Sequence, residues 1–213
     1  MRVIAIDGPA GAGKSTVARR VADRLALRQL DTGAMYRAVA WLALHEGVPL
    51  DDSEAIAKLA QAAEIEVGDD AVAVNGHDVT LAIRTPEVNA AVTPVAANSA
   101  VRSELVGRQR EWVHTNRGGV IEGRDIGSVV FPMADLKLYL TASPAVRAHR
   151  RAVEMGLSDD AAVRALEKTI ADRDASDRGR TDGPLTIVEG AVVIDTSERD
   201  IDDIVDEIVG LLR

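Results

Sequence analysis

Apolar residues recur along the chain with two different spacings, and each spacing predicts a different kind of element. The short β-branched run at residues 3–6 is typical of a buried parallel strand. Val17, Val21 and Leu25 then follow at intervals of four, which predicts a helix. The two segments together predict a βα unit near residue 1.

Strand-like and helix-like segments continue to alternate beyond this unit. Further core strands are expected at residues 28–30, 119–122, 136–140 and 192–194. One helix is expected to end near Gly47, a second to run from a cap at Ser53 to about residue 63, and a third to run from a cap at Asn98 or Ser99 to a stop at Gly118-Gly119. A fourth helix is expected to begin at Ser143-Pro144, and a break at 156–158 separates it from a fifth, which runs to about Arg173. The last helix is expected to begin around Thr196 or Ser197. This order predicts an α/β fold with a five-stranded parallel sheet flanked by helices.

Residues 64–84 follow a different pattern. Apolar residues alternate with other residues around 65–67 and 72–74, and Asn75-Gly76 is a strong hairpin turn signal. We interpret this segment as a small β insertion in the α/β fold.

Composition narrows the function classes. The net charge of −9 opposes nonspecific attraction to nucleic acid, and an aromatic content of 2% leaves few side chains on which bases could stack. No apolar run approaches the length of about 18 residues that a membrane span requires, the first residues lack a secretory signal pattern, and cysteine is absent. We therefore expect a cytoplasmic protein that binds neither a nucleic acid polymer nor a membrane.

Residues 8–16 fit the pattern GxxxxGK[ST] at every fixed position and directly follow the first expected strand. Glycines let the backbone curl so that successive N–H groups converge on a phosphate, and Lys14 adds a mobile positive charge. The pattern predicts that the ATP phosphates bind Gly8, Pro9, Ala10, Gly11, Ala12, Gly13, Lys14, Ser15 and Thr16. Ser15 would also be a ligand of Mg²⁺.

Other sequence features narrow the class of P-loop protein. The NKxD pattern of GTPases and an LSGGQ-like motif are both absent. Arginines are instead distributed among the segments that follow the P-loop. Because arginine binds phosphate with a planar fork of donors, these residues indicate a second phosphate site.

Four segments resemble the bacterial cytidylate kinases, in chain order and over nearly the whole length. They are DTGAMYR at 31–37, EGRDIGSVVFP at 122–132, RAHRR at 147–151, and RDASDRGR at 173–180, which is followed by Pro184-Leu185. Thr32 stands where serine is frequent in that family, and Ser176 stands where some relatives have a basic residue.

The resemblance implies a nucleoside monophosphate kinase fold in three functional parts. These are a core at about 1–32, 98–148 and 174–213, a nucleotide-binding region at about 33–97 that contains the β insertion, and a helical lid at about 149–173. The implied reaction converts ATP and CMP or dCMP to ADP and CDP or dCDP, with Mg²⁺ as the cofactor. We expect a monomer.

The resemblance also implies a role for each matched residue. Lys14 would bridge the β and γ oxygens of ATP, and Arg150 and Arg151 would supply charge to the transferring phosphoryl group. The acceptor phosphate would bind Arg37, Arg124 and Arg180, and cytosine would bind Thr93, Arg102 and Asp125. The sugar would bind Arg173 and Asp177, and Thr32 and Tyr36 would lie beside the nucleotide. Salt bridges, helix caps and core packing are the structural alternatives for these residues.

The implied chemistry requires no general base, because the attacking phosphate oxygen is already anionic at neutral pH. The catalytic set is therefore cationic: Lys14, Arg124, Arg150, Arg151 and Arg180. Two alternatives remain open. One is another small-molecule P-loop kinase, acting on UMP, shikimate or dephospho-coenzyme A; the other is a nonenzymatic regulator gated by ATP.

Overall fold

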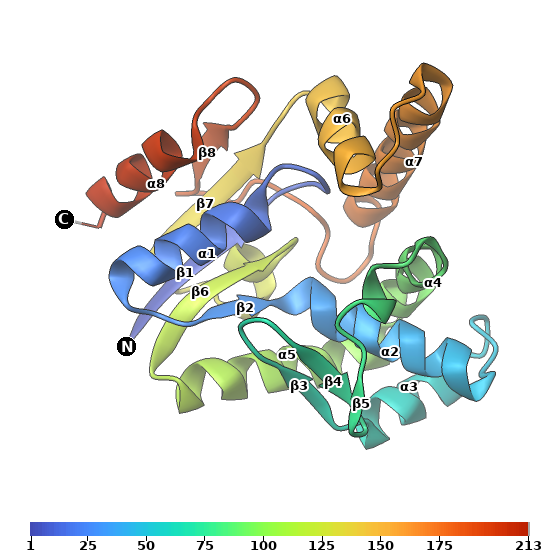
Figure 1. Ribbon diagram of the computed structural model, residues 1–213. Helices are drawn as coiled ribbons and strands as arrows, with labels where there is room; N and C mark the ends of the chain where they lie inside the picture. The colour runs from blue at the N-terminus through green and yellow to red at the C-terminus, as the bar shows by residue number, and fades with distance from the viewer. Residues whose placement is uncertain (213) are drawn as a thin grey trace. The chain divides into compact units, whose positions relative to one another are not determined.

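The computed structural model describes residues 1–212 (Figure 1). Its strands are β1 (Arg2–Asp7), β2 (Gln29–Asp31), β3 (Ile65–Val67), β4 (Val72–Val74), β5 (His77–Asp78), β6 (Gly118–Gly123), β7 (Leu136–Thr141) and β8 (Val192–Asp195). Its α-helices are α1 (Lys14–Leu25), α2 (Thr32–Glu46), α3 (Ser53–Ala62), α4 (Pro86–Ala97), α5 (Ser99–Thr115), α6 (Pro144–Glu154), α7 (Asp160–Arg178) and α8 (Ile201–Gly210). Two short helical segments, η1 (Ala82–Arg84) and η2 (Ile126–Val130), complete the order.

The chain forms two compact units. One consists of Met1–Gln29 together with the chain from Gly118 onward, and we call it the sheet unit; the other is Leu30–Arg117, which we call the inserted unit. The central sheet has the strand order β2-β6-β1-β7-β8. The pairs β1–β6, β1–β7 and β7–β8 are parallel, so the predicted α/β fold and its five core strands are confirmed.

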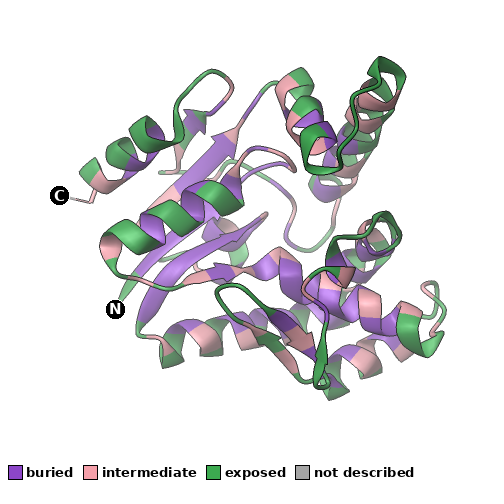
Figure 2. Ribbon diagram, viewed as in Figure 1, coloured by how far each residue is buried: buried purple, intermediate pink, exposed green. Residues whose placement is uncertain are grey.

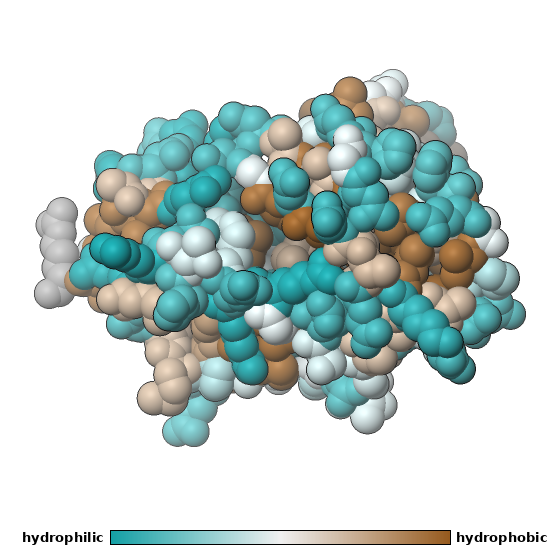
Figure 3. Space-filling model, turned by 90° about the horizontal axis from the view of Figure 1, so that it is seen from below, coloured by the Kyte–Doolittle hydropathy of each residue, from teal (hydrophilic) through white to brown (hydrophobic). Residues whose placement is uncertain are grey.

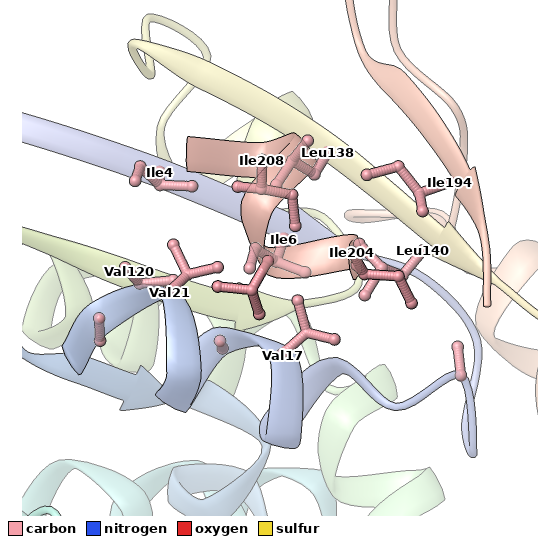
Figure 4. Packing of buried hydrophobic residues seen from close by; sticks show 14 residues of the cluster. Ile4, Ile6, Val17, Val21, Val120, Leu138, Leu140, Ile194, Ile204 and Ile208 are labelled. Atoms are coloured by element: carbon pink, nitrogen blue, oxygen red, sulfur yellow. The ribbon is translucent and has the colours of Figure 1, made fainter. Parts of the chain in front are cut away.

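The core of the sheet unit lies between the sheet and two helices, α1 and α8. Val17 and Val21 of α1 and Ile204 of α8 pack in one cluster with strand residues such as Ile4 and Leu138 (Figure 4). The spacing of four along α1 places its apolar side chains on one face. Figure 2 shows the result, because β1 and β6 are buried while the outer face of α1 is exposed.

The inserted unit contains α2 to α5 and a small sheet of order β3-β4-β5, and both of its strand pairs are antiparallel. Asn75 and Gly76 join β4 to β5 with positive φ angles of 49° and 76°. This is the conformation that Asn-Gly favours in a tight hairpin turn. The predicted β insertion is therefore confirmed.

Several helix boundaries differ from the predictions. Asp52, not Ser53, caps α3, because its side chain accepts a hydrogen bond from the Ala55 N–H. Asp200 caps α8, so the expected start at Thr196 or Ser197 is wrong. α7 continues to Arg178, beyond the expected end near Arg173.

Two further differences concern glycine and proline. α5 ends at Thr115, and Gly118-Gly119 belongs to β6 instead of stopping the helix. Sequence analysis also missed α4, although Thr85 caps it and Pro86 occupies its first turn. Pro94 inside α4 conceals the helix in the sequence, because proline removes an internal donor.

One face of the molecule is largely polar (Figure 3). On the face that Figure 3 shows, hydrophilic residues predominate and hydrophobic residues are interspersed among them. Among residues 1–212, no helix combines the length and the apolar character needed to cross a membrane.

Candidate active site

The loop between β1 and α1 adopts a conformation that its glycines make possible. Gly8 has φ 148°, and a Cβ there would lie 2.0 Å from the Leu140 carbonyl oxygen. Gly13 has φ 82° and directly precedes α1, whose first turn is capped by no side chain that the structure describes. The N–H groups at this helix end are therefore suited to bind an anion.

The carbonyl groups of the same loop are bound by donors from distant segments. The Ala10 carbonyl accepts a hydrogen bond from Nη1 of Arg147 (3.1 Å), and Oγ1 of Thr196 lies 3.0 Å from the Ala12 carbonyl oxygen. Nζ of Lys14 donates to the Pro9 carbonyl (2.8 Å). Lys14 therefore lies folded against the loop to which a phosphate would bind.

Ser15 is connected to Glu122, an acidic residue to which sequence analysis gave no role. Its hydroxyl donates to Oε2 of Glu122 at the end of β6 (2.8 Å), and Nε2 of Gln29 donates to Oε1 of the same carboxylate (2.9 Å). Glu122 is buried, with 3% of its surface exposed. Its sequence signals are its place as the first residue of the EGRDIGSVVFP segment and its position near the end of an expected core strand.

These two oxygen donors fit Mg²⁺. In phosphate-transferring proteins this ion takes one or two protein oxygens and completes its octahedron with waters and phosphate oxygens. The hydroxyl of Ser15 and the carboxylate of Glu122 supply that number and type of ligand. The predicted metal residue Ser15 therefore has a suitable partner.

A second buried carboxylate, Asp7, ends β1 and holds the segment after Arg124. Oδ1 of Asp7 accepts from the Ile126 N–H and Oδ2 from the Gly127 N–H, both at 2.8 Å. Burial raises the pKa of Asp7 to about 6, although these two hydrogen bonds lower it. Sequence analysis missed this residue; its signal is an acidic residue between a buried strand and a glycine-rich loop.

Three predicted acceptor-site residues meet in the sheet unit. Nε of Arg124 donates to Oδ2 of Asp177 (2.8 Å), and Arg180 also pairs with this carboxylate. Burial alone would raise the pKa of Asp177, but the charges of Arg124, Arg180 and Arg173 and the Arg124 hydrogen bond outweigh it and lower the pKa. Arg173 is therefore close enough to act on the same carboxylate.

The inserted unit brings together other predicted residues. The guanidinium of Arg102 lies 5.8 Å from the centre of the Tyr36 ring, within the range of a cation–π interaction. Nη2 of Arg37 donates to Oδ2 of Asp31 (2.7 Å), and Asp31 caps α2. Burial would raise the pKa of Asp31, but the charge and hydrogen bond of Arg37 lower it.

The remaining predicted residues have simpler environments. Thr32 is buried in the first turn of α2, Thr93 is half-buried in α4, and Asp125 is buried next to η2. Arg124 and Asp125 belong to the sheet unit, whereas Thr93 and Arg102 belong to the inserted unit. The structure therefore shows two groups of predicted residues, and their joint use on one ligand stays a prediction.

The arginines of α6 have different partners. Arg147 is buried and donates to Oδ2 of Asp174 in α7 (2.6 Å), while Nη2 of Arg150 donates to the Thr196 carbonyl (2.7 Å). Arg151 pairs with the exposed Glu154 (2.8 Å). Sequence analysis did not identify the partners of Arg147 and Arg150, because the contacts join segments far apart in the chain.

The parallel sheet flanked by helices, together with the glycine-rich loop between β1 and α1, is the fold of the P-loop kinases. The crystal structure of a gluconokinase from Sinorhizobium meliloti 1021 superimposes with a TM-score of 0.52 at 16% identity, covering 99% of this chain and 91% of that one. At this identity the likeness concerns the fold alone.

The particular family follows from the sequence match. The chain matches the family described as cytidylate kinase over residues 4–213, and it belongs to that family. It is 44% identical to the cytidylate kinase of Solibacter usitatus (99% of this chain, 92% of that protein) and 48% identical to the bifunctional pantoate ligase/cytidylate kinase of Synechocystis sp. (99% of this chain, 42% of that protein). The chain spans about two fifths of the bifunctional relatives, and the predicted family is confirmed.

Proposed function

We propose that this protein transfers the γ-phosphoryl group of ATP to CMP or dCMP and releases ADP with CDP or dCDP. The observation that carries the proposal is the match to the cytidylate kinase family over residues 4–213. The uncapped start of α1 behind a glycine-rich loop supports a phosphate donor at this end of the chain. As the family resemblance implies, the acceptor supplies the attacking oxygen.

For the donor, the P-loop N–H groups and Lys14 bind the phosphates. Lys14 donates one hydrogen bond to the Pro9 carbonyl, and its ammonium group has three N–H donors, so it can also bind the β and γ oxygens. Ser15 and Glu122 would hold Mg²⁺, which neutralises charge on the β and γ phosphates when bound. Ser15 and Glu122 are already within hydrogen-bond distance, so these oxygens need little rearrangement.

For the acceptor, Arg37, Arg124 and Arg180 bind the phosphate, and Arg173 and Asp177 bind the sugar. Support comes from the pairing of Arg124 and Arg180 with one buried carboxylate. This pairing fixes the direction of both guanidinium groups, and the several N–H donors of a guanidinium suit it to bind a phosphate. An oxygen of the acceptor phosphate attacks the γ phosphorus, and the bond from that phosphorus to the β–γ bridging oxygen breaks as ADP leaves.

For the base, we propose that Asp125 accepts from the amino group of cytosine, while Arg102 and Thr93 contact the ring. The Arg102–Tyr36 contact supports this role, because it holds a buried guanidinium beside an aromatic face. UMP presents a carbonyl oxygen in place of the amino group, so the carboxylate disfavours it. Arg150 and Arg151 stay proposed as charge donors to the transferring group, and Thr196 and Glu154 are their partners in this conformation.

A coupled assay of ADP release tests the proposal across CMP, dCMP, UMP, AMP and shikimate. We expect turnover with CMP and dCMP and little with the other acceptors. Failure with both cytidine nucleotides contradicts the proposal, and preference for UMP or shikimate identifies a different P-loop kinase. Binding of ATP without turnover on any acceptor supports a regulator instead. Light scattering on the same sample tests the monomer that we also propose.

A further inference from the structure

The P-loop presents its N–H groups on one side only if its carbonyl groups face the other side. In a trans peptide the C=O and N–H bonds point in opposite directions, so a donor that binds one carbonyl fixes the direction of the following N–H. The Ala10 carbonyl accepts from Nη1 of Arg147, and Thr196 lies 3.0 Å from the Ala12 carbonyl. These contacts orient the N–H groups of Gly11 and Gly13.

Arg147 is fixed in this position from several directions. Its Nε donates to the Ala142 carbonyl (3.1 Å), and its Nη1 also donates to Oδ2 of Asp174 (2.6 Å). The side chains of Arg147 and Asp174 are 7% and 2% exposed. A guanidinium with these partners cannot change its direction without breaking a buried ion pair, so the Ala10 carbonyl has a rigid donor.

A buried ion pair often adds little to the free energy of unfolding. Desolvation of both charges offsets their attraction, and an apolar pair of similar volume is often as stable. Oδ1 of Asp174 is moreover buried without a hydrogen-bond partner in the structure. The cost of this arrangement indicates that Arg147 has a role beyond packing.

Thr196 and Arg150 add a second fixed point. Nη1 of Arg150 donates to Oγ1 of Thr196 (3.0 Å), which leaves the hydroxyl proton to the carbonyls of Ala12 and Thr141 at 3.0 and 3.1 Å. Thr196 is 2% exposed. The hydroxyl therefore connects α6 to the P-loop through one buried oxygen.

We propose that Arg147, held by Asp174, and Thr196 are positioning residues that aim the P-loop N–H groups at the donor triphosphate. The inference rests on the proposed function only in naming ATP as the ligand. A cation at the Ala10 carbonyl also polarises that peptide, so the Gly11 N–H becomes a stronger donor. Loss of these contacts weakens binding of the donor nucleotide and leaves binding of the acceptor nucleotide unchanged.

Two sets of variants test this role by direct calorimetric binding of ATP with Mg²⁺ and, separately, of CMP. The double variant Arg147→Met with Asp174→Leu removes both charges, so no unpaired charge stays buried while the donor to Ala10 is lost. Thr196→Val removes the hydroxyl at nearly constant volume, and Thr196→Ser restores it. The control is Arg20→Gln with Asp202→Asn, an exposed pair (2.8 Å) that joins α1 to α8.

We expect the dissociation constant of ATP with Mg²⁺ to rise about tenfold or more in the double variant and in Thr196→Val, as for the loss of a charge-assisted or buried hydrogen bond. The constant for CMP should stay within about twofold, and Thr196→Ser and the control should match wild type. Unchanged ATP affinity in folded Thr196→Val and in the double variant overturns the inference, as does equal loss of ATP and CMP affinity. If the double variant does not fold, the comparison of Thr196→Val with Thr196→Ser tests the inference. A wild-type protein that binds ATP but fails with every cytidine nucleotide overturns the proposed function alone.

Discussion

The Ser15 hydroxyl donates to Oε2 of Glu122 over 2.8 Å, although 107 positions separate the two residues. The contact joins the first turn of α1 to the end of β6, because β1 and β6 are neighbours in the sheet. It places a carboxylate next to the one P-loop side chain that the motif assigns to a metal. Glu122 is therefore the acidic residue on which the proposed use of Mg²⁺ depends.

Glu122→Gln should lower kcat at least tenfold and raise the Mg²⁺ concentration needed for half-maximal activity. The amide keeps a similar shape and can still accept from Ser15, but it removes the negative charge that favours the ion. Titration of activity with Mg²⁺ at saturating ATP and CMP measures both effects. Glu207→Gln in α8 is the matched control and should behave like wild type, and an unchanged Mg²⁺ dependence in Glu122→Gln would count against the proposed ligand.

Arg124→Ala should raise KM for CMP at least tenfold and leave the affinity for ATP within about twofold. The variant removes donors proposed for the acceptor phosphate, whereas the P-loop is untouched. Steady-state kinetics with CMP varied and separate ATP binding measure the difference. Arg20→Ala, on the exposed face of α1, is the control. Equal loss of both affinities in a folded Arg124→Ala protein would falsify the assignment.

Asp125→Asn should lower the ratio of kcat/KM for CMP to that for UMP by about tenfold or more. A carboxylate only accepts hydrogen bonds, but an amide also donates, so the variant can meet the carbonyl oxygen of uracil. Parallel assays with the two nucleotides give the ratio. The control Asp23→Asn in α1 should leave this ratio unchanged. An unchanged ratio in Asp125→Asn would show that another residue recognises the amino group.

Asp7 should make stability depend on pH in a specific direction. Its pKa of about 6 in the folded protein exceeds the ordinary value of 3.8, so the folded state binds the proton more tightly than the unfolded state between these values. Wild type should therefore lose about 2 kcal/mol of unfolding free energy relative to Asp7→Asn as pH rises from about 4 to about 7.

Urea unfolding of both proteins over this range measures the change, and the difference between them cancels the other titrating groups. Asn supplies one acceptor where Asp7 supplies two, which adds an offset that does not vary with pH. A difference that stays constant with pH would show that burial does not raise the pKa of Asp7.

Arg108→Met should destabilise the inserted unit by about 2 kcal/mol without changing KM for CMP. Its guanidinium donates to the carbonyls of Ala60, Gln61 and Ala63 at the end of α3, where a positive charge also complements the helix dipole. Thermal or urea unfolding measures the loss. Lys58→Met removes an exposed charge from the same helix and should cost less than about 0.5 kcal/mol.

Features that depend on nearby residues could be predicted from the sequence. The β1 run, the spacing along α1, the Ser143-Pro144 cap and the Asn75-Gly76 turn each arise from neighbouring residues, and each is confirmed. The predicted start of α8 was wrong because Thr196 is a residue type that often caps helices. In the structure its hydroxyl is instead buried against the P-loop.

The parts of the candidate site that depend on distant contacts could not be predicted. Arg147 and Asp174 are 27 positions apart, and the Asp7 carboxylate binds N–H groups 119 and 120 positions away. Nothing in local spacing distinguishes Arg147 and Asp174 from ordinary surface charges, and the position of Asp7 before the glycine-rich loop does not identify its distant partners. The motif residues were found because their order resembles a family, whereas the residues that hold them require the fold.

The chain leaves the sheet unit and returns to it at one place. The Arg28 carbonyl accepts from the Val120 N–H over 2.9 Å, so the two ends of the intervening segment are held together by the first ladder bond of neighbouring strands. A segment anchored in this way is an insertion whose two ends lie side by side at the sheet. Evolution or a protein engineer can lengthen, shorten or exchange it without opening the sheet, so the proposed base contacts of Thr93 and Arg102 can diverge while the P-loop and its carbonyl donors are inherited unchanged.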